Sequence, residues 1–261
     1  MSSFIAQVPE KPSLTRLKHI RPVHDLSSVL LHRESFTDFE ADVLATYSRQ
    51  LNTELAGWNS ADLPDKRSVD YIIRVFRTHL PRFKDTPHKV PGNDLAIVIE
   101  SPKLINSGLG STIDTHRTVL RVNHKNNAAD AHKDIGLRST IQMMDEYNCY
   151  KFTRNFLPKN NFPVGSFNIF SGSKSDLAAC LEYARYLDCG GDPSSFFVLK
   201  PSFRGAISVL SKDQYPSLGF IAIAFGLRLF DKITVYGFDG SSFEREELTA
   251  CSEYSSSFLI K

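Results

Sequence analysis

The residues Leu95–Ile99 read L-A-I-V-I, and they are followed by a turn rich in small residues, S-P-K-L-I-N-S-G-L-G at Ser101–Gly110. The chain then returns to an apolar run, T-V-L-R-V at Thr118–Val122. Three further apolar runs and two helical patterns follow: strands at Thr140–Met144, Ser195–Lys200 and Lys232–Tyr236, and helices at Ser175–Leu187 and Ser217–Phe230. Apolar strands separated by helices are typical of a largely parallel sheet with helices on both faces. We therefore expect a Rossmann-like α/β domain at residues 91–261.

The residues before this domain show a different sequence pattern. Residues 1–36 mix Pro, Ser, Lys, Arg and His without sustained periodicity, which predicts a flexible, poorly packed arm. Residues 37–90 form an N-terminal helical segment in this interpretation. Its first helix has apolar residues at three- and four-residue spacing from Phe39 to Leu51, and its second extends from Ser68 to about Leu80, before Pro81.

Composition and charge exclude several classes of protein. The chain has 261 residues, 41% of them hydrophobic and 23% charged, which is ordinary for a globular protein. A net charge of +2 gives no reason to expect a nucleic acid as partner. No run of eighteen apolar residues is present, and the first residues lack the apolar centre of a signal peptide, so the chain alone reads as soluble and without an anchor.

The cysteines predict free thiols. Cys149, Cys180, Cys189 and Cys251 have no metal-type spacing, and Cys180 and Cys189 are too far apart for a redox pair. The chain also lacks an Asp-x-Asp motif. The sequence therefore suggests neither a metal nor another cofactor.

Two segments carry the chemistry. The glycine-containing turn lies where open α/β sheets bind ligands, and we expect its exposed backbone N–H groups and small side chains to let a phosphate approach. The pattern I-D-x-H-x-x-V-x-R-x-N at Ile113–Asn123 follows this turn. The second segment, Y-P-S-L-G at Tyr215–Gly219, introduces an apolar helix. The N-terminus of a helix favours a bound phosphate or carboxylate, because its N–H groups are unpaired and its dipole end is positive.

Together, Leu95–Thr140 and Tyr215–Phe238 resemble the large and small sialyl motifs of eukaryotic-type sialyltransferases, glycosyltransferase family 29. The resemblance implies a GT-A-related, metal-independent enzyme. Such an enzyme transfers sialic acid with inversion, from CMP-sialic acid to a glycan acceptor in protein glycosylation. It also implies the Golgi, where the family is usually membrane-anchored.

The resemblance assigns the donor nucleotide to a small set of residues. Asn123, Ser217 and Gly219 match family positions that contact the donor, and Leu218 has lost the hydroxyl usual at its position. We add Ser101 in the turn and Gly237, which could let the backbone approach the nucleotide. The alternative roles are structural: a strand-terminal amide for Asn123 and an N-cap for Ser217.

Other matched positions have structural roles in our interpretation. Asp114 and His116 resemble family residues that shape the large motif. Asp134, Gly136 and Arg138 match a D-x-G-x-[KR] stretch, for which an internal Arg–Asp pair is as good an explanation as a ligand contact.

The sequence departs from the family in three places. Glu100 occupies the position of an Asn thought to contact the donor phosphate, and two negative charges about 4 Å apart repel by roughly 4 kcal/mol at an effective dielectric of 20. Leu95 and Phe230 occupy the positions of a family disulfide, so an apolar contact is expected there, as in a compartment where thiols stay reduced.

The third departure concerns the general base. The family supplies it from histidine motifs beyond the small motif, whereas His132 is the last histidine of these 261 residues. We therefore leave the catalytic residue unknown and expect little transfer by this chain. The carboxylates that follow are Glu244, Glu246, Glu247 and Glu253, which equally fit a solvated acidic helix. The alternatives are a noncatalytic nucleotide-binding or interaction protein and, third, another Rossmann enzyme such as a dehydrogenase, although no G-x-G-x-x-G follows a strand.

Overall fold

The computed structural model describes residues 25–54, 66–87, 89, 92–99, 101–123, 132–145, 147–149, 167–171, 176–194, 196–211, 216–238 and 258–260. These residues build one sheet of seven strands in the order β5-β4-β3-β2-β1-β6-β7. The strands are β1 (Asp94–Ile99), β2 (Thr118–Val122), β3 (Ile141–Met144), β4 (Phe167–Phe170), β5 (Phe196–Val198), β6 (Lys232–Tyr236) and β7 (Phe258–Ile260). All six pairings between neighbouring strands are parallel, which confirms the predicted Rossmann-like α/β class.

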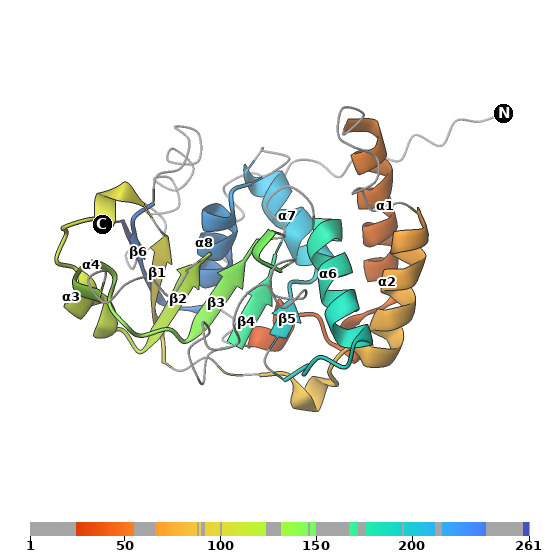
Figure 1. Ribbon diagram of the computed structural model, residues 1–261, viewed down its shortest axis with the longest axis horizontal. Helices are drawn as coiled ribbons and strands as arrows, with labels where there is room; N and C mark the ends of the chain where they lie inside the picture. The colour runs from red at the N-terminus through yellow and green to blue at the C-terminus, as the bar shows by residue number, and fades with distance from the viewer. Residues whose placement is uncertain are drawn as a thin grey trace.

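Helices cover both faces of the sheet, as its apolar strands require. They are α1 (Asp38–Glu54), α2 (Lys66–His79), α3 (Gly110–Asp114), α4 (His132–Ile135), α6 (Asp176–Asp188), α7 (Pro201–Ser211) and α8 (Leu218–Leu229). In Figure 1, α1, α2 and α6 lie together at one end of the sheet and α3 and α4 at the other. The apolar helix α8 packs on one face of the sheet, opposite the face that α3 covers.

Alternation of side chains along the strands assigns the buried residues to the two faces. On β1, Leu95 and Ile97 belong to the cluster under α8, whereas Ala96 and Val98 belong to the cluster with Ile113 of α3. A third cluster joins α1, α2 and α6 to the ends of β4 and β5. The expected apolar replacement for the family disulfide is consistent with this core, because Leu95 and Phe230 are both buried in the cluster under α8.

The predicted flexible arm is wrong for the residues that the structure describes between 25 and 36. Leu26, Val29, Leu30 and Leu31 are all 0% exposed, and Leu30 forms an isolated antiparallel bridge with Leu199 after β5. The segment was misread because its two turns of 3-10 helix, Leu26–Ser28 and Arg33–Ser35, are too short to show periodicity.

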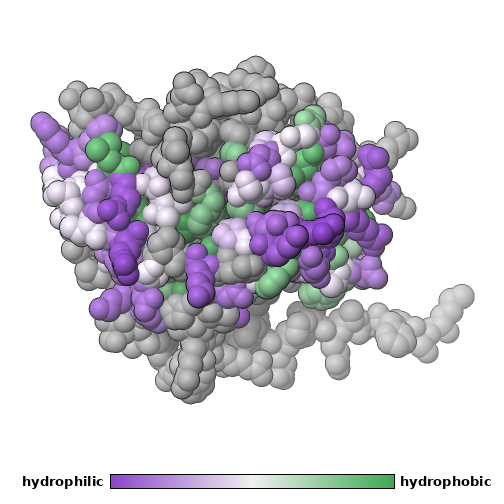
Figure 2. Space-filling model, turned by 90° about the horizontal axis from the view of Figure 1, so that it is seen from below, coloured by the Kyte–Doolittle hydropathy of each residue, from purple (hydrophilic) through white to green (hydrophobic). Residues whose placement is uncertain are grey.

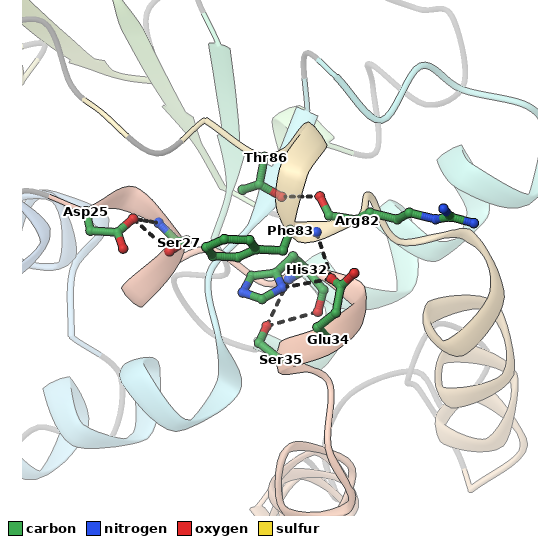
Figure 3. Close-up of polar contacts among 8 residues, drawn as sticks. All are labelled: Asp25, Ser27, His32, Glu34, Ser35, Arg82, Phe83 and Thr86. Carbon is green, nitrogen blue, oxygen red and sulfur yellow. Dashed lines mark hydrogen bonds and ion pairs between the residues drawn. The ribbon is translucent and has the colours of Figure 1, made fainter.

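Polar contacts hold this segment against the residues that follow α2. The Glu34 carboxylate accepts a hydrogen bond of 2.7 Å from the Phe83 N–H and lies 3.3 Å from His32 Nδ1 (Figure 3). The His32 ring packs edge-on against the Phe83 ring. The backbone N–H of Arg33 donates to the Pro81 carbonyl at 2.8 Å. The region 25–36 is therefore part of the packed fold, and the predicted boundaries between the segments remain predictions.

The described surface shows no single apolar face. Exposed large apolar side chains are scattered over different elements: Phe39, Phe83, Ile105, Leu137 and Tyr147. On the side drawn in Figure 2, hydrophobic areas are separated by hydrophilic residues. None of the described helices is both long and apolar enough to cross a bilayer.

Candidate functional site

The order of the strands places a topological switch point between β1 and β6. From β1 the chain adds β2, β3, β4 and β5 on one side, and it then crosses to β6 on the other side. Val98 pairs with Tyr236, so the two strands end at nearly the same level. Open parallel sheets bind ligands outside the carboxyl ends of their strands at such a point. The candidate site is therefore this edge of the sheet.

Ser101 lies directly beyond β1 at this edge. Its Oγ accepts a hydrogen bond of 3.2 Å from the Lys103 N–H and caps the short 3-10 helix Pro102–Leu104. Lys103 extends from the same turn, and its Nζ lies 3.5 Å from the carbonyl oxygen of Phe238 beyond β6. The turn after β1 and the end of β6 are thus joined by a positively charged side chain.

Gly237 lets the chain after β6 lie close to the end of β1. Its φ is +77°, and a Cβ at this position would lie 2.3 Å from the Ile99 carbonyl oxygen and 2.8 Å from Leu104 Cδ1. We expected Gly237 to let the backbone approach a nucleotide. In the structure, the backbone that approaches it is that of β1, and its contact with a ligand remains a prediction.

The N-terminus of α8 lies at the same edge. Ser217 is its exposed N-cap, with Oγ accepting a hydrogen bond of 3.1 Å from the Phe220 N–H. Gly219 is buried in the first turn, and a Cβ there would lie 2.9 Å from Ile99 Cδ1 and 3.5 Å from Phe238. The positive end of a twelve-residue helix therefore lies against the carboxyl ends of β1 and β6. The structure brings together Ser101, Ser217, Gly219 and Gly237.

Asn123 follows β2, the neighbour of β1, and has a positive φ of 53°. Its Nδ2 donates to Asp145 Oδ2 at 2.7 Å, and its Oδ1 accepts from the Asp145 N–H at 2.9 Å and from Asn148 Nδ2 at 3.1 Å. The amide thus fixes the turn after β3. These contacts support the structural role that we gave as the alternative for Asn123. A contact between Asn123 and the donor nucleotide remains a prediction.

Sequence reasoning missed Asp145 and Asn148. Asp145 Oδ1 accepts hydrogen bonds from both the backbone and the side chain of Asn148, at 2.8 and 2.9 Å. The position of Asp145 could have revealed it, because Asp145 comes directly after a predicted strand, as Asn123 does.

The turn that we expected to offer its N–H groups to a phosphate is partly occupied from within. The carboxylate of Asp134, in α4, accepts hydrogen bonds from the N–H groups of Asn106 and Gly108 at 2.8 and 2.9 Å. These bonds lower the pKa of Asp134, with Gly108 the largest cause. Asp134 is consequently a structural anchor for this turn, and two of the predicted phosphate-binding groups are already paired.

The other residues matched to the family have structural contacts. Asp114 accepts hydrogen bonds from the backbone N–H groups of Leu137 and Arg138, the latter at 2.8 Å. The Arg–Asp pair that we expected within the stretch Asp134–Arg138 is not seen among the described residues, because Asp134 accepts hydrogen bonds from Asn106 and Gly108. The Arg138 side chain instead donates to the His116 carbonyl at 3.2 Å.

His116 lies between two polar partners. Its Nδ1 is 3.1 Å from Asp94 Oδ2 and its Nε2 is 3.0 Å from the Tyr236 hydroxyl. His116 therefore ties β1 to β6, and its position confirms the packing role we expected from the sequence.

Several predicted residues lie outside the described part of the chain. They are Glu100, Tyr215, Cys251 and the four late glutamates Glu244, Glu246, Glu247 and Glu253. Cys149, Cys180 and Cys189 are not joined in disulfide bonds, as predicted. Within the described ranges, no group of three or more His, Cys, Asp or Glu side chains is placed to hold a metal ion.

Comparisons with known proteins agree with this geometry. The model of glycosyltransferase family 29 (sialyltransferase) matches residues 52–250. A crystal structure of a mammalian sialyltransferase in complex with Gal-beta-1-3GalNAc-ortho-nitrophenol superposes with a TM-score of 0.62 at 16% identity, covering 98% of this chain and 96% of that chain. A second crystal structure of a mammalian sialyltransferase gives 0.60 at 15% identity, with 98% and 95% coverage. No curated protein sequence matches the chain.

The family match covers well over half of the chain, and the two structural likenesses show the same fold. The chain belongs to glycosyltransferase family 29, the sialyltransferases.

Proposed function

We propose that this chain is a sialyltransferase-like glycosyltransferase that binds CMP-sialic acid at the switch point between β1 and β6 and acts on a glycan acceptor. The observation that carries the proposal is the position of the α8 N-terminus. Gly219 lets the first turn of this helix contact Ile99 and Phe238, beside the turn that contains Ser101.

The chemistry of the donor fits this edge. CMP-sialic acid presents a phosphate and a carboxylate, and both are favoured at a helix N-terminus by its unpaired N–H groups and its dipole. Lys103 adds a positive charge to the same edge through its contact with the Phe238 carbonyl. The Ser217 hydroxyl can donate to a ligand oxygen while its lone pair accepts from Phe220.

A second candidate function, noncatalytic binding of a nucleotide, is favoured by the state of Asp145. This carboxylate lies at the same edge of the sheet, but Asn123 and Asn148 already donate three hydrogen bonds from side chains and backbone to its two oxygens. A general base needs a free lone pair directed at the acceptor hydroxyl. Asp145 is therefore better suited to holding the site than to accepting a proton from a glycan.

Calorimetric titration separates these functions from an unrelated Rossmann site. CMP should bind more tightly than AMP or NADH, and equal affinity for the three nucleotides would overturn the proposal as a whole. Transfer of labelled sialic acid from CMP-sialic acid to lactose or a glycoprotein then distinguishes an enzyme from a noncatalytic binder. The Golgi remains our proposed compartment on the strength of the family, and fractionation of cells producing the protein would test it.

A further inference from the structure

Asn123, Asp145 and Asn148 form a hydrogen-bonded cluster at the carboxyl edge of the sheet. Asn123 directly follows β2 and Asp145 directly follows β3, the next two strands beyond β1. Val122 pairs with Ile99, so Asn123 lies one residue beyond the level at which β1 ends. Because neighbouring strands are about 4.8 Å apart, the cluster begins one strand away from the turn after β1.

The partners of Asn123 determine which way its amide faces. The backbone N–H of Asp145 can only donate, so the Asn123 atom 2.9 Å from it must be the oxygen Oδ1. The same oxygen accepts from Asn148 Nδ2 at 3.1 Å. The nitrogen Nδ2 then donates at 2.7 Å to Asp145 Oδ2, and a carboxylate oxygen can only accept. A reversed amide would set donor against donor at the backbone and acceptor against acceptor at the carboxylate, so one orientation is selected.

Both oxygens of Asp145 are occupied in this cluster, whereas the Asn123 amide keeps one N–H group. Asp145 Oδ1 accepts from the backbone and the side chain of Asn148 at 2.8 and 2.9 Å. The Asn123 amide nitrogen carries two hydrogens, and the bond to Asp145 uses one of them. In the part of the chain that the structure describes, Asn123 Nδ2 has no second hydrogen-bond partner. Asn123 is only partly buried, so this second N–H is available to a ligand at the edge.

We propose that Asp145 is a positioning residue of the donor site, which orients Asn123 so that it offers a ligand an N–H group and no acceptor. The inference rests on the proposed CMP-sialic acid site, because it concerns the polarity of one contact there. The ligand atom that meets Asn123 must accordingly be a hydrogen-bond acceptor. The phosphate, the sialic acid carboxylate and the carbonyl oxygen of cytosine meet this requirement, whereas the cytosine amino group does not.

Exchanging the two side chains separates this positioning role from a packing role. Asn123→Asp combined with Asp145→Asn can keep all five hydrogen bonds of the cluster, with the 2.7 Å bond reversed in direction. Asn123→Asp alone sets two carboxylates against each other, and Asp145→Asn alone sets two amide nitrogens against each other. Each single variant should therefore unfold at a lower temperature than the wild type. The double variant should regain most of this loss.

Titration calorimetry on the complete chain then measures the affinity for CMP. The double variant should bind CMP about tenfold more weakly than the wild type, or weaker still, because position 123 no longer carries an N–H. Recovery of both stability and affinity would make the amide a packing element only and would overturn the proposal. A double variant that is no more stable than the single variants would also overturn it, because the inferred orientation requires the exchange to be tolerated.

NMR of isotope-labelled wild-type protein tests the same contact without a change of charge. The two side-chain amide protons of Asn123 are identified by their loss in Asn123→Ala. Saturating CMP should move the resonance of one proton and leave that of the proton bonded to Asp145 in place. If neither resonance moves while CMP binds, the proposal is wrong. A wild type that binds CMP no better than AMP would instead overturn the proposed function, while the unfolding midpoints of the exchanged variants need no ligand and still test the orientation.

Discussion

Asn123 and Asp145 exchange two hydrogen bonds across the ends of β2 and β3, one of 2.7 Å from the Asn123 amide and one of 2.9 Å to it. A carboxamide nitrogen carries two hydrogens, and the bond to Asp145 uses one. The second remains for a ligand oxygen. The exchange can therefore orient the amide towards a donor while it stabilises the turn after β3, so the structural and the binding roles of Asn123 are compatible.

The first prediction follows from this pair. Asn123→Ala should weaken CMP binding about 10- to 100-fold, because a hydrogen bond to the nucleotide worth about 1 to 3 kcal/mol is lost. The control is Asn148→Ala, which removes the neighbouring 3.1 Å contact to Asn123 and should change CMP affinity less than threefold. Titration calorimetry of both folded variants measures the difference. Equal losses in the two variants would assign Asn123 to structure alone.

The second prediction compares two glycines of α8. A Cβ at Gly226 would lie 2.9 Å from Leu95 Cδ2 and 3.2 Å from both Ile97 and Ile233, whereas one at Gly219 has a single contact below 3.4 Å, to the end of the Ile99 side chain. Gly226→Ala should therefore lower the free energy of unfolding by about 1 to 3 kcal/mol through overpacking. Gly219→Ala should cost less, because Ile99 can move and alanine is the better helix former.

Ligand binding should show the opposite order for the same two variants. Gly219→Ala places a methyl group in the first turn of α8 and should weaken CMP binding, whereas Gly226→Ala should leave it unchanged. Denaturant titrations and calorimetry on each protein give both quantities. If Gly226→Ala loses more affinity than Gly219→Ala, in the same order as the loss of stability, Gly219 has a packing role only.

The third prediction concerns pH and the N-terminal segment. The pKa of Glu34 is lowered from its ordinary value of 4.5, first by its own backbone N–H and then by Phe83 and His32. Because the folded-state pKa lies below the unfolded one, the carboxylate stabilises the fold fully above about pH 4.5. This contribution is lost as the pH falls through the folded-state value.

Glu34→Gln tests the sign of this dependence. The difference in unfolding free energy between wild type and variant should be constant near neutral pH and shrink in acid. Asp38→Asn is the control. Asp38 pairs with Arg77 at 2.9 Å, and 92% of the Asp38 side chain is exposed. Exposed ion pairs of this kind contribute little to the free energy of unfolding. A difference for Glu34→Gln that grows in acid would contradict the prediction.

The sequence predicted the fold well where the apolar runs were long. β1, β2, β3 and β6 match the predicted strands to within a residue, and α8 differs from its prediction by one residue at each end. The strands β4 and β7, of four and three residues, were not predicted. The strands β3 and β5 are as short, but longer predicted runs, Thr140–Met144 and Ser195–Lys200, cover them. The helix α7 was also missed.

The candidate site was predictable in its location but not in its contacts. Ser101, Ser217, Gly219 and Gly237 gather at one edge because the order of the strands places them there. The partners of Asn123 and the occupation of the glycine turn by Asp134 depend on side chains that are 22 and 26 residues distant in sequence. Such contacts leave no periodic signal in a single sequence.

The last prediction uses two charged residues of opposite sign in the stretch that follows β1. Lys103→Met should weaken CMP binding about tenfold if its ammonium group faces the phosphate, and Lys103→Arg should largely restore it. If the Glu100 carboxylate faces the phosphate, Glu100→Asn should strengthen binding at pH 7, because it removes the repulsion between two negative charges. The gain from Glu100→Asn should shrink as the pH falls towards about 4.3, the reference pKa of a glutamate side chain. The loss from Lys103→Met should be measured beside this gain at pH 7. Titrations of CMP at several pH values measure both effects. If both substitutions shift CMP affinity in the same direction, the charges act through the fold of the turn, and the phosphate lies elsewhere.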